Sequence, residues 1–341
     1  MKVKKPNPSI QNTMMSFLRI RELPLLFFIF IMIVILSIGS PAFLQRANFL
    51  SLARGFSIEG VTLIGMTMLL VSGVFDISVG SVMALAGDVC SMLLAAHVSL
   101  PLAILGGLGV GCLCGTINGI IIARLKVNPF IATFGMLSIA RSIGLAITQG
   151  YPIVVSNKVF TFLGIGLVGG IPVSFIILIF LVILADFAMR RVRFFRQLYF
   201  MGGNEAGAQL IGINTIRTRI ISYIFIGLMA GLSGVLSSAR LSGATPNAYI
   251  GIELKLIVAA VVGGCTLKGG EGTIAGSMLG LVFLFFLSNS MTLLGVNMYG
   301  EPFVLGFFLV LVVLYNMYAP TRLTRKNKSL DSNPKIGGGG A

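Results

Sequence analysis

The sequence predicts an all-α, polytopic membrane protein with about ten transmembrane helices and both termini in the cytoplasm. The first observation is composition: of 341 residues, 56% are hydrophobic and only 10% are charged, and the mean hydropathy is +0.99. Soluble domains carry about 25% charged residues, so this composition excludes a soluble enzyme and a disordered chain. The second observation is a series of apolar runs of membrane-crossing length. The third is that basic residues gather between these runs.

The apolar runs place the predicted spans in order along the chain. They lie at about 23–40, 56–74, 77–96, 101–123, 128–149, 171–189, 220–239, 251–266, 273–294 and 302–319. The run at 251–266 is short, and a glycine-rich stretch at 263–272 follows it. Irregular backbone at membrane depth is tolerated only where protein or a water cavity covers it, so we expect a broken or re-entrant helix there.

The distribution of Lys and Arg predicts the orientation. With the N-terminus inside, nineteen of the 25 basic residues fall on the cytoplasmic side, and five (Arg46, Arg54, Lys158, Arg240 and Lys255) fall outside. This bias favours cytoplasmic termini. We therefore expect a cytoplasmic tail at 1–22, a transmembrane domain at 23–320 and a second cytoplasmic tail at 321–341. The net charge of +15 is interpreted as a topology signal, and no nucleic-acid partner is expected.

The basic cytoplasmic loop contains an apolar segment at about 202–214. Asn204 suits a helix N-cap, Glu205 to Ile211 would form about two helical turns, and Gly212 is a stop signal. Two interpretations stay open: a short interfacial helix on the bilayer, or a knob that docks on a cytoplasmic partner. The residues assigned to this loop are Gly203, Asn204, Glu205, Ala206, Ala208, Leu210, Ile211, Gly212 and Ile213.

Several ordered motifs resemble one family. Residues 72–81 (SGVFDISVGS) resemble its "GGIDLSVGS" stretch, 128–136 (NPFIATFGM) resemble its "PPFIVTLGT", and 202–214 resemble its coupling loop. Motifs from 239 to 272 follow in the family's order, and agreement covers roughly residues 50–320. The chain thus resembles the permease subunits of bacterial ABC importers of the ribose, xylose and autoinducer-2 group.

The resemblance implies a set of partners. Cytoplasmic ATPase subunits would dock on the coupling loop, and a periplasmic or lipid-anchored binding protein would deliver the substrate. A second permease, identical or related, would complete the pathway within the membrane lipid. The expected location is the bacterial plasma (inner) membrane.

The residues themselves indicate no catalytic or metal site. His97 is the only histidine, which excludes His-based triads and multi-His metal sites. No G-x-x-x-x-G-K-[ST] motif occurs. We expect no cofactor in this chain, with ATP and Mg²⁺ bound by a separate ATPase.

Polar residues within the spans are candidates for the translocation pathway, because charges at membrane depth tend to be paired or to line a cavity. Asp88 and Arg141 are expected to form a buried ion pair in preference to contacting substrate, and Asp76 is expected to cap the helix that follows it. The full set is Asp76, Ser78, Ser81, Asp88, Asn118, Thr133, Ser138, Arg141 and Asn289.

Four basic residues of the outer side are candidates for docking the binding protein, with Arg240 the first choice. They are Arg46, Arg54, Lys158 and Arg240.

The predicted function is that of a permease subunit of an ATP-driven importer, carrying a pentose, hexose or autoinducer-2-like sugar. Two alternatives stay open. One is an ABC permease for nucleosides or branched-chain amino acids, and the other is a secondary transporter or channel that needs no ATPase.

Overall fold

The computed structural model describes residues 23–295, 300, 302–304, 306–307 and 310. The two predicted tails and most of the predicted tenth span lie outside these residues. The helices are α2 (Leu23–Gly39), α3 (Arg46–Val71), α4 (Val79–Ala95), α5 (Leu100–Ala123), α6 (Pro129–Thr148), α7 (Lys158–Ile165), α8 (Val173–Arg191), α9 (Arg193–Gly203), α10 (Glu205–Leu210), α11 (Thr215–Leu241), α12 (Ile252–Val262) and α13 (Ile274–Leu293). The strands are β1 (Ile153–Val154), β2 (Leu167–Val168), β3 (Ile171–Pro172) and β4 (Gly243–Ala244).

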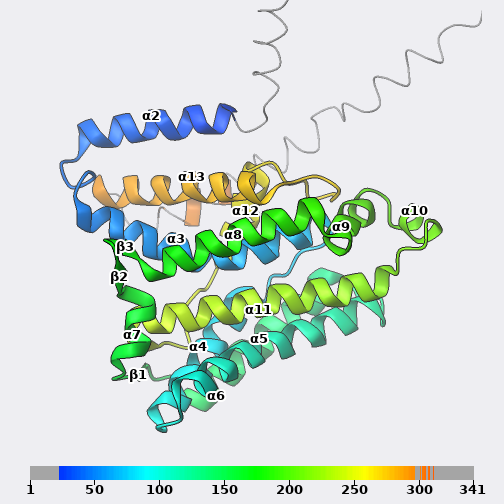
Figure 1. Ribbon diagram of the computed structural model, residues 1–341, viewed down its shortest axis with the longest axis horizontal. Coiled ribbons are helices and arrows are strands. Elements are labelled where there is room, and N and C mark those ends of the chain that lie inside the picture. The colour runs from blue at the N-terminus through cyan, green and yellow to red at the C-terminus, as the bar shows by residue number, and fades with distance from the viewer. Residues whose placement is uncertain (1–22, 296–299, 301, 305, 308–309, 311–341) are drawn as a thin grey trace, which may run out of the picture.

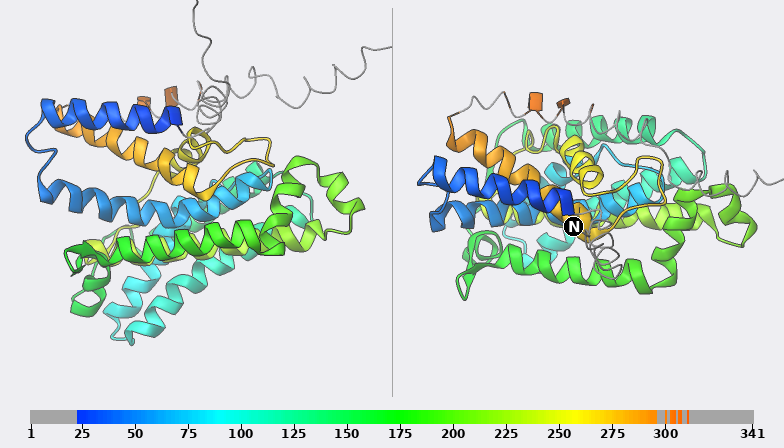
Figure 2. Two further views of the ribbon diagram at one scale, coloured as in Figure 1. Left: turned by 45° about the horizontal axis from the view of Figure 1, so that its top comes forward. Right: turned by 90° about the horizontal axis from the view of Figure 1, so that it is seen from above.

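The long helices run side by side and give the bundle two distinct ends (Figure 1). Helices α2, α13, α3 and α8 lie on one side of the bundle, and α11, α4, α5 and α6 lie on the other (Figures 1 and 2). One end carries α9 and α10 and is called the α10 end below. The opposite end carries α7 and the four strands and is called the strand end.

The prediction of a mostly helical, polytopic protein is confirmed. Among the described residues, six helices are long and apolar enough to cross a membrane, and α2 and α4 are shorter apolar helices. Helix α3 begins at Arg46, ten residues before the predicted start of its span, so Arg46 and Arg54 lie in a helix and not in a loop. Two short antiparallel pairs, β1 with β4 and β2 with β3, add strand structure that the all-α prediction lacks.

Helix α11 lies at the centre of the bundle and packs against α3, α4 and α5. Glycines at its contact with α5 let the two backbones approach closely. A Cβ on Gly111 would overlap the carbonyl of Gly227, and a Cβ on Gly115 would overlap the carbonyl of Tyr223. Small residues are typical of helix contacts in membranes, where close packing replaces the hydrophobic effect as the driving force.

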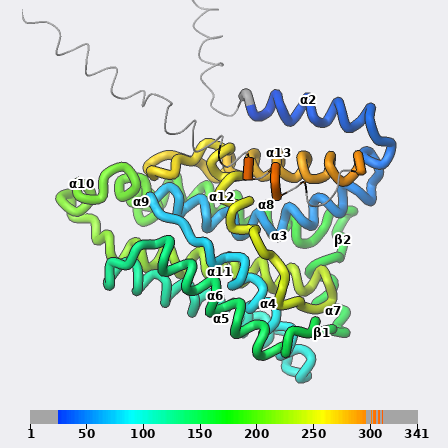
Figure 3. The backbone as a smooth tube through the Cα atoms, turned by 180° about the vertical axis from the view of Figure 1, so that it is seen from behind, coloured from blue at the N-terminus to red at the C-terminus, as the bar shows by residue number. Residues whose placement is uncertain are grey.

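The predicted eighth span is broken. Its helical part, α12, has only 11 residues, about 16 Å at the α-helical rise. The segment 243–251 precedes α12, and at its start β4 pairs with β1 at the strand end. The segment then passes α4 and enters α12, which leads toward the α10 end (Figure 3). The non-helical segment and α12 together run along the bundle between its two ends, as a single helix does in the other spans.

Candidate functional site

The apolar loop at the α10 end forms a short, exposed helix. Asn204 caps α10, because its Oδ1 accepts a hydrogen bond from the backbone N–H of Gly207 at 2.9 Å. The Leu210 side chain is 90% exposed and that of Ile211 is 66% exposed, whereas Ala208 is buried. Two large apolar side chains therefore project outward beside an anchored small one.

Glu205 is tied to the bundle. Its Oε2 lies 3.0 Å from Nη2 of Arg219 on α11, and the Arg219 side chain is only 14% exposed. The sequence groups Glu205 with the residues expected to dock a partner. Glu205 and Arg219 are 14 residues apart in the chain, so no local pattern indicates this ion pair.

Glycine backbones join the α9–α10 segment to the ends of two membrane helices. The N–H of Gly270 donates to the carbonyl of Val71, the last residue of α3, at 2.8 Å. A Cβ on Gly202 would overlap that same carbonyl, and a Cβ on Gly269 would lie 2.7 Å from Cα of Gly73. We call Gly73, Gly202, Gly269 and Gly270 the glycine junction.

Tyr199 of α9 adds a side-chain link next to the glycine junction. Its hydroxyl donates to the carbonyl of Gly272 at 2.9 Å. Burial raises the pKa of Tyr199, so the phenol stays protonated and remains a donor at neutral pH.

Three of the predicted intramembrane residues form one buried network before α4. Asp76 Oδ1 accepts from the N–H of Ser78 at 2.7 Å and from its hydroxyl at 2.6 Å. Asp76 Oδ2 accepts from Nδ2 of Asn118 on α5 at 3.2 Å. All three side chains are buried. The network holds the start of α4 against α5.

The predicted ion pair between Asp88 and Arg141 is not formed in this structure. Nη1 of Arg141 donates instead to the backbone carbonyls of Pro246 at 2.5 Å and Ala248 at 2.7 Å. Asp88 is fully buried, and neither of its oxygens has a hydrogen-bond partner among the described residues. The physical reason is the broken span, whose non-helical half presents carbonyls without helical partners, and Arg141 satisfies them.

The other predicted intramembrane residues do not join a common cluster. Ser81 is buried, and its hydroxyl has no partner in the described part of the chain. Thr133 and Ser138 both donate to carbonyls of their own helix α6, and Ser138 is exposed. Asn289 exchanges amide hydrogen bonds with Asn48, which ties α13 to α3.

The four predicted docking residues lie toward the strand end of α3, α7 and α11, but they differ in exposure. Arg46 and Lys158 are exposed, whereas Arg54 and Arg240 are half-buried. Arg54 donates to the carbonyl of Ile165 at 2.7 Å. Lys255, which the sequence placed on the outer side, lies within α12 and pairs with Glu59 at 3.1 Å. Lys255 therefore lies inside the bundle and not in a loop.

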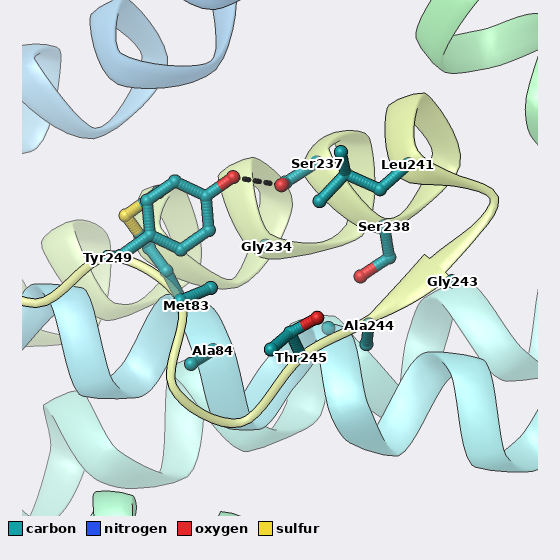
Figure 4. A pocket seen from close by; sticks show the side chains of 12 residues that line it. Met83, Ala84, Gly234, Ser237, Ser238, Leu241, Gly243, Ala244, Thr245 and Tyr249 are labelled. Carbon is teal, nitrogen blue, oxygen red and sulfur yellow. Dashed lines mark hydrogen bonds between the residues drawn. The ribbon is translucent and has the colours of Figure 1, made fainter. Parts of the chain in front are cut away.

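A small cavity borders the non-helical half of the broken span (Figure 4). Thr245 and Tyr249 line it from the segment, and Ser237 and Ser238 line it from α11. The hydroxyls of Ser237 and Tyr249 are hydrogen-bonded to each other (Figure 4). The cavity measures about 10 Å³, which is room for about one water molecule. Within the described residues, no group of three or more His, Cys, Asp or Glu side chains could hold a metal ion.

Membrane-length helices, a broken span and an exposed apolar segment at one end are the features of a multi-pass membrane protein. Comparison with known families identifies it further. Residues 48–314 match the family described as the branched-chain amino acid transport system permease component, and the chain belongs to that family.

Sugar permeases are among the similar proteins. The chain is 35% identical over 288 residues to the ribose import permease protein RbsC of Escherichia coli K12, covering 83% of this chain and 90% of that one. It is also 35% identical to RbsC of Bacillus subtilis, covering 84% and 89%. It is 32% identical to the L-arabinose transport system permease protein AraH of Escherichia coli K12, covering 84% and 88%. No solved structure matches the chain.

These findings confirm the predicted family and the predicted location. The chain is an ABC-type permease with long apolar helices. It belongs to the inner membrane, where permeases of this type lie. The similarity to ribose and arabinose permeases agrees with the predicted class of substrate.

Proposed function

We propose that this chain is the permease subunit of an ABC importer and forms the pathway for a pentose, hexose or autoinducer-2-like sugar. The observation that carries the proposal is identity of 32–35% to ribose and arabinose permeases over 83–84% of the chain. A chain with this identity over most of its length is expected to share the fold of these permeases and their general task.

A separate ATPase, with its own ATP and Mg²⁺, drives the transport and docks at α10. The 90% exposed Leu210 supports this assignment, since a large apolar side chain exposed at a helix end fits a groove on a partner. Glu205 and Arg219 hold α10 at a fixed angle to α11. When ATPase binding or hydrolysis moves α9 and α10, the backbone contacts of the glycine junction transmit this movement to the end of α3 and to the loop after α12.

The α10 end faces the cytoplasm in this proposal, and both tails lie on the same side, because most basic residues lie there. The strand end faces outward and receives the binding protein, with Arg46, Arg54, Lys158 and Arg240 at or near the contact. A second permease, identical or related, completes the pathway, and each permease domain contributes about ten spans at 23–320.

Reconstitution tests the proposal. The purified chain is incorporated into liposomes with its cognate ATPase and binding protein, and uptake of radiolabelled D-ribose and L-arabinose is measured with and without ATP. We expect ATP-dependent uptake of at least one sugar, and we expect the chain alone to hydrolyse no ATP. Uptake of leucine or of a nucleoside in place of sugar supports the alternative cargo. Uptake that needs an ion gradient and no ATPase identifies a secondary transporter.

A further inference from the structure

The buried carboxylate of Asp88 has no explanation in the packing of the bundle. Its side chain is 0% exposed, and both oxygens have no hydrogen-bond partner among the described residues. Burial of a carboxylate without donors is costly, and nearly all buried polar groups in proteins have a partner. A partner for Asp88 is therefore expected in some state of the transport cycle.

The groups nearest to Asp88 lie on α6 and on the segment that precedes α12. Its Oδ2 faces Gly144 on α6, where a Cβ would lie only 2.9 Å from that oxygen and 3.9 Å from Cβ of Pro246. The glycine at position 144 therefore lets α6 pack directly against the Asp88 carboxylate, next to the non-helical half of the broken span. Arg141 lies about one turn before Gly144 on the same helix, and only its Nη1 carries the hydrogen bonds to Pro246 and Ala248.

The charges at this place disfavour an anionic solute. Both Glu253 and Asp88 attract Arg141 electrostatically. Glu253 lies in the first turn of α12, where the helix dipole stabilises a negative charge. Two carboxylates and one guanidinium leave no excess of positive charge, so the site does not attract an anion. A hydroxyl group donates one hydrogen bond and accepts others, so it satisfies a carboxylate and a guanidinium together.

We propose that Asp88 and Arg141 form the contact site for a neutral, polyhydroxylated solute beside the broken span. Hydroxyl groups of the solute donate to the Asp88 carboxylate and accept from the Arg141 guanidinium. This inference rests on the proposed function and gives the sugar a position in the chain. The cavity that the same segment lines, about 10 Å³, is too small for a sugar (Figure 4). The solute is therefore admitted when segment 243–251 moves and Arg141 exchanges its carbonyl partners for hydroxyls.

The test uses the complete complex of permease, ATPase and binding protein in liposomes, with D-ribose and L-arabinose as probes. Asp88→Asn and Arg141→Lys are expected to lower sugar uptake about tenfold or more, since a hydrogen bond to a charged group contributes on that scale. Ser91→Ala is the matched control, because Ser91 is also buried on α4 with no partner for its hydroxyl among the described residues. Its uptake is expected to stay within about twofold of wild type. The melting temperature of each assembled complex is measured in parallel.

The outcomes separate the inference from the function on which it rests. Loss of uptake in Asp88→Asn and Arg141→Lys, with wild-type melting temperatures and with uptake retained in Ser91→Ala, supports the site. Wild-type uptake in both variants overturns it, and so does a loss of uptake that parallels a loss of thermal stability, while the proposed function stands. If the wild-type complex takes up no sugar, the proposed function fails and this inference fails with it.

Discussion

Lys255 and Glu59 form an ion pair inside the helix bundle, with Nζ of Lys255 3.1 Å from Oε1 of Glu59. The two side chains are only 12% and 16% exposed, and the ammonium also lies 4.4 Å from the ring centre of Phe285. The pair joins α12, the helical half of the broken span, to the middle of α3. A long unbroken helix thereby fixes the position of a short one.

This pair predicts a stability effect. Lys255→Ala or Glu59→Ala removes one member of a buried pair and leaves the other without its main opposite charge. Such changes cost about 3–5 kcal/mol. We expect both single variants to lower the melting temperature of the purified chain in detergent. The double variant Glu59→Ala with Lys255→Ala is expected to lose less than the sum of the single losses, and additive losses would show that the pair is not coupled.

The exposed apolar tip of α10 predicts a loss of ATPase binding. Leu210→Asp places a charge where we propose an apolar groove, and hot-spot residues of this kind contribute about 2 kcal/mol or more. We expect the ATPase to fail to copurify and uptake to stop, while the chain keeps its melting temperature because Leu210 is 90% exposed. Gln209→Asp, also exposed and adjacent, is the matched control. Normal copurification of Leu210→Asp would identify α10 as an interfacial helix.

The glycine junction predicts a contrast between two adjacent residues. A Cβ on Gly202 would overlap the carbonyl of Val71 and the N–H of Gly270, whereas a Cβ on Gly203 meets nothing within 4 Å. Gly202→Ala is therefore expected to push α9 away from α3. The measurements are melting temperature and sugar-stimulated ATPase rate of the assembled complex. We expect both to fall in Gly202→Ala and to stay at wild-type values in Gly203→Ala; equal behaviour of the two variants would contradict this role.

Hydropathy and capping patterns located most of the helices. Nine predicted spans coincide with helices to within several residues at most ends, because membrane helices are dictated by local apolar length. The cap at Asn204 and the end of the short helix near Gly212 were also predicted correctly, since both are local signals.

Contacts between distant segments could not be predicted from local sequence patterns. Sequence reasoning paired Asp88 with Arg141 because both charges lie at membrane depth. The competing partners of Arg141 are main-chain carbonyls near Pro246, which exist as acceptors only because the span is broken. Likewise, the ion pairs of Glu205 with Arg219 and of Glu59 with Lys255 depend on packing between helices. Backbone acceptors and tertiary pairs carry no local signature in one sequence.

The exposed cations at the strand end predict a salt-dependent association with the binding protein. Arg240 was the first choice from sequence, but it is half-buried, and its guanidinium lies 3.3 Å from where a Cβ on Gly55 would be. Arg46 and Lys158 are exposed and have the freedom to meet acidic side chains of a docked partner. Charges at the rim of an interface act mainly on the association rate, and salt screens them.

We therefore expect Arg46→Glu and Lys158→Glu to slow association of the binding protein with the reconstituted permease at low salt. At about 1 M salt the Debye length is about 3 Å, so the difference from wild type is expected to disappear. Arg240→Glu is expected to lower thermal stability as well, because the Arg240 side chain is packed against α3. Measuring the melting temperature of each variant therefore separates an effect on folding from an effect on docking. Surface plasmon resonance at two salt concentrations gives the rates. An association rate that neither exposed charge reversal changes would mean that the binding protein docks elsewhere on the strand end.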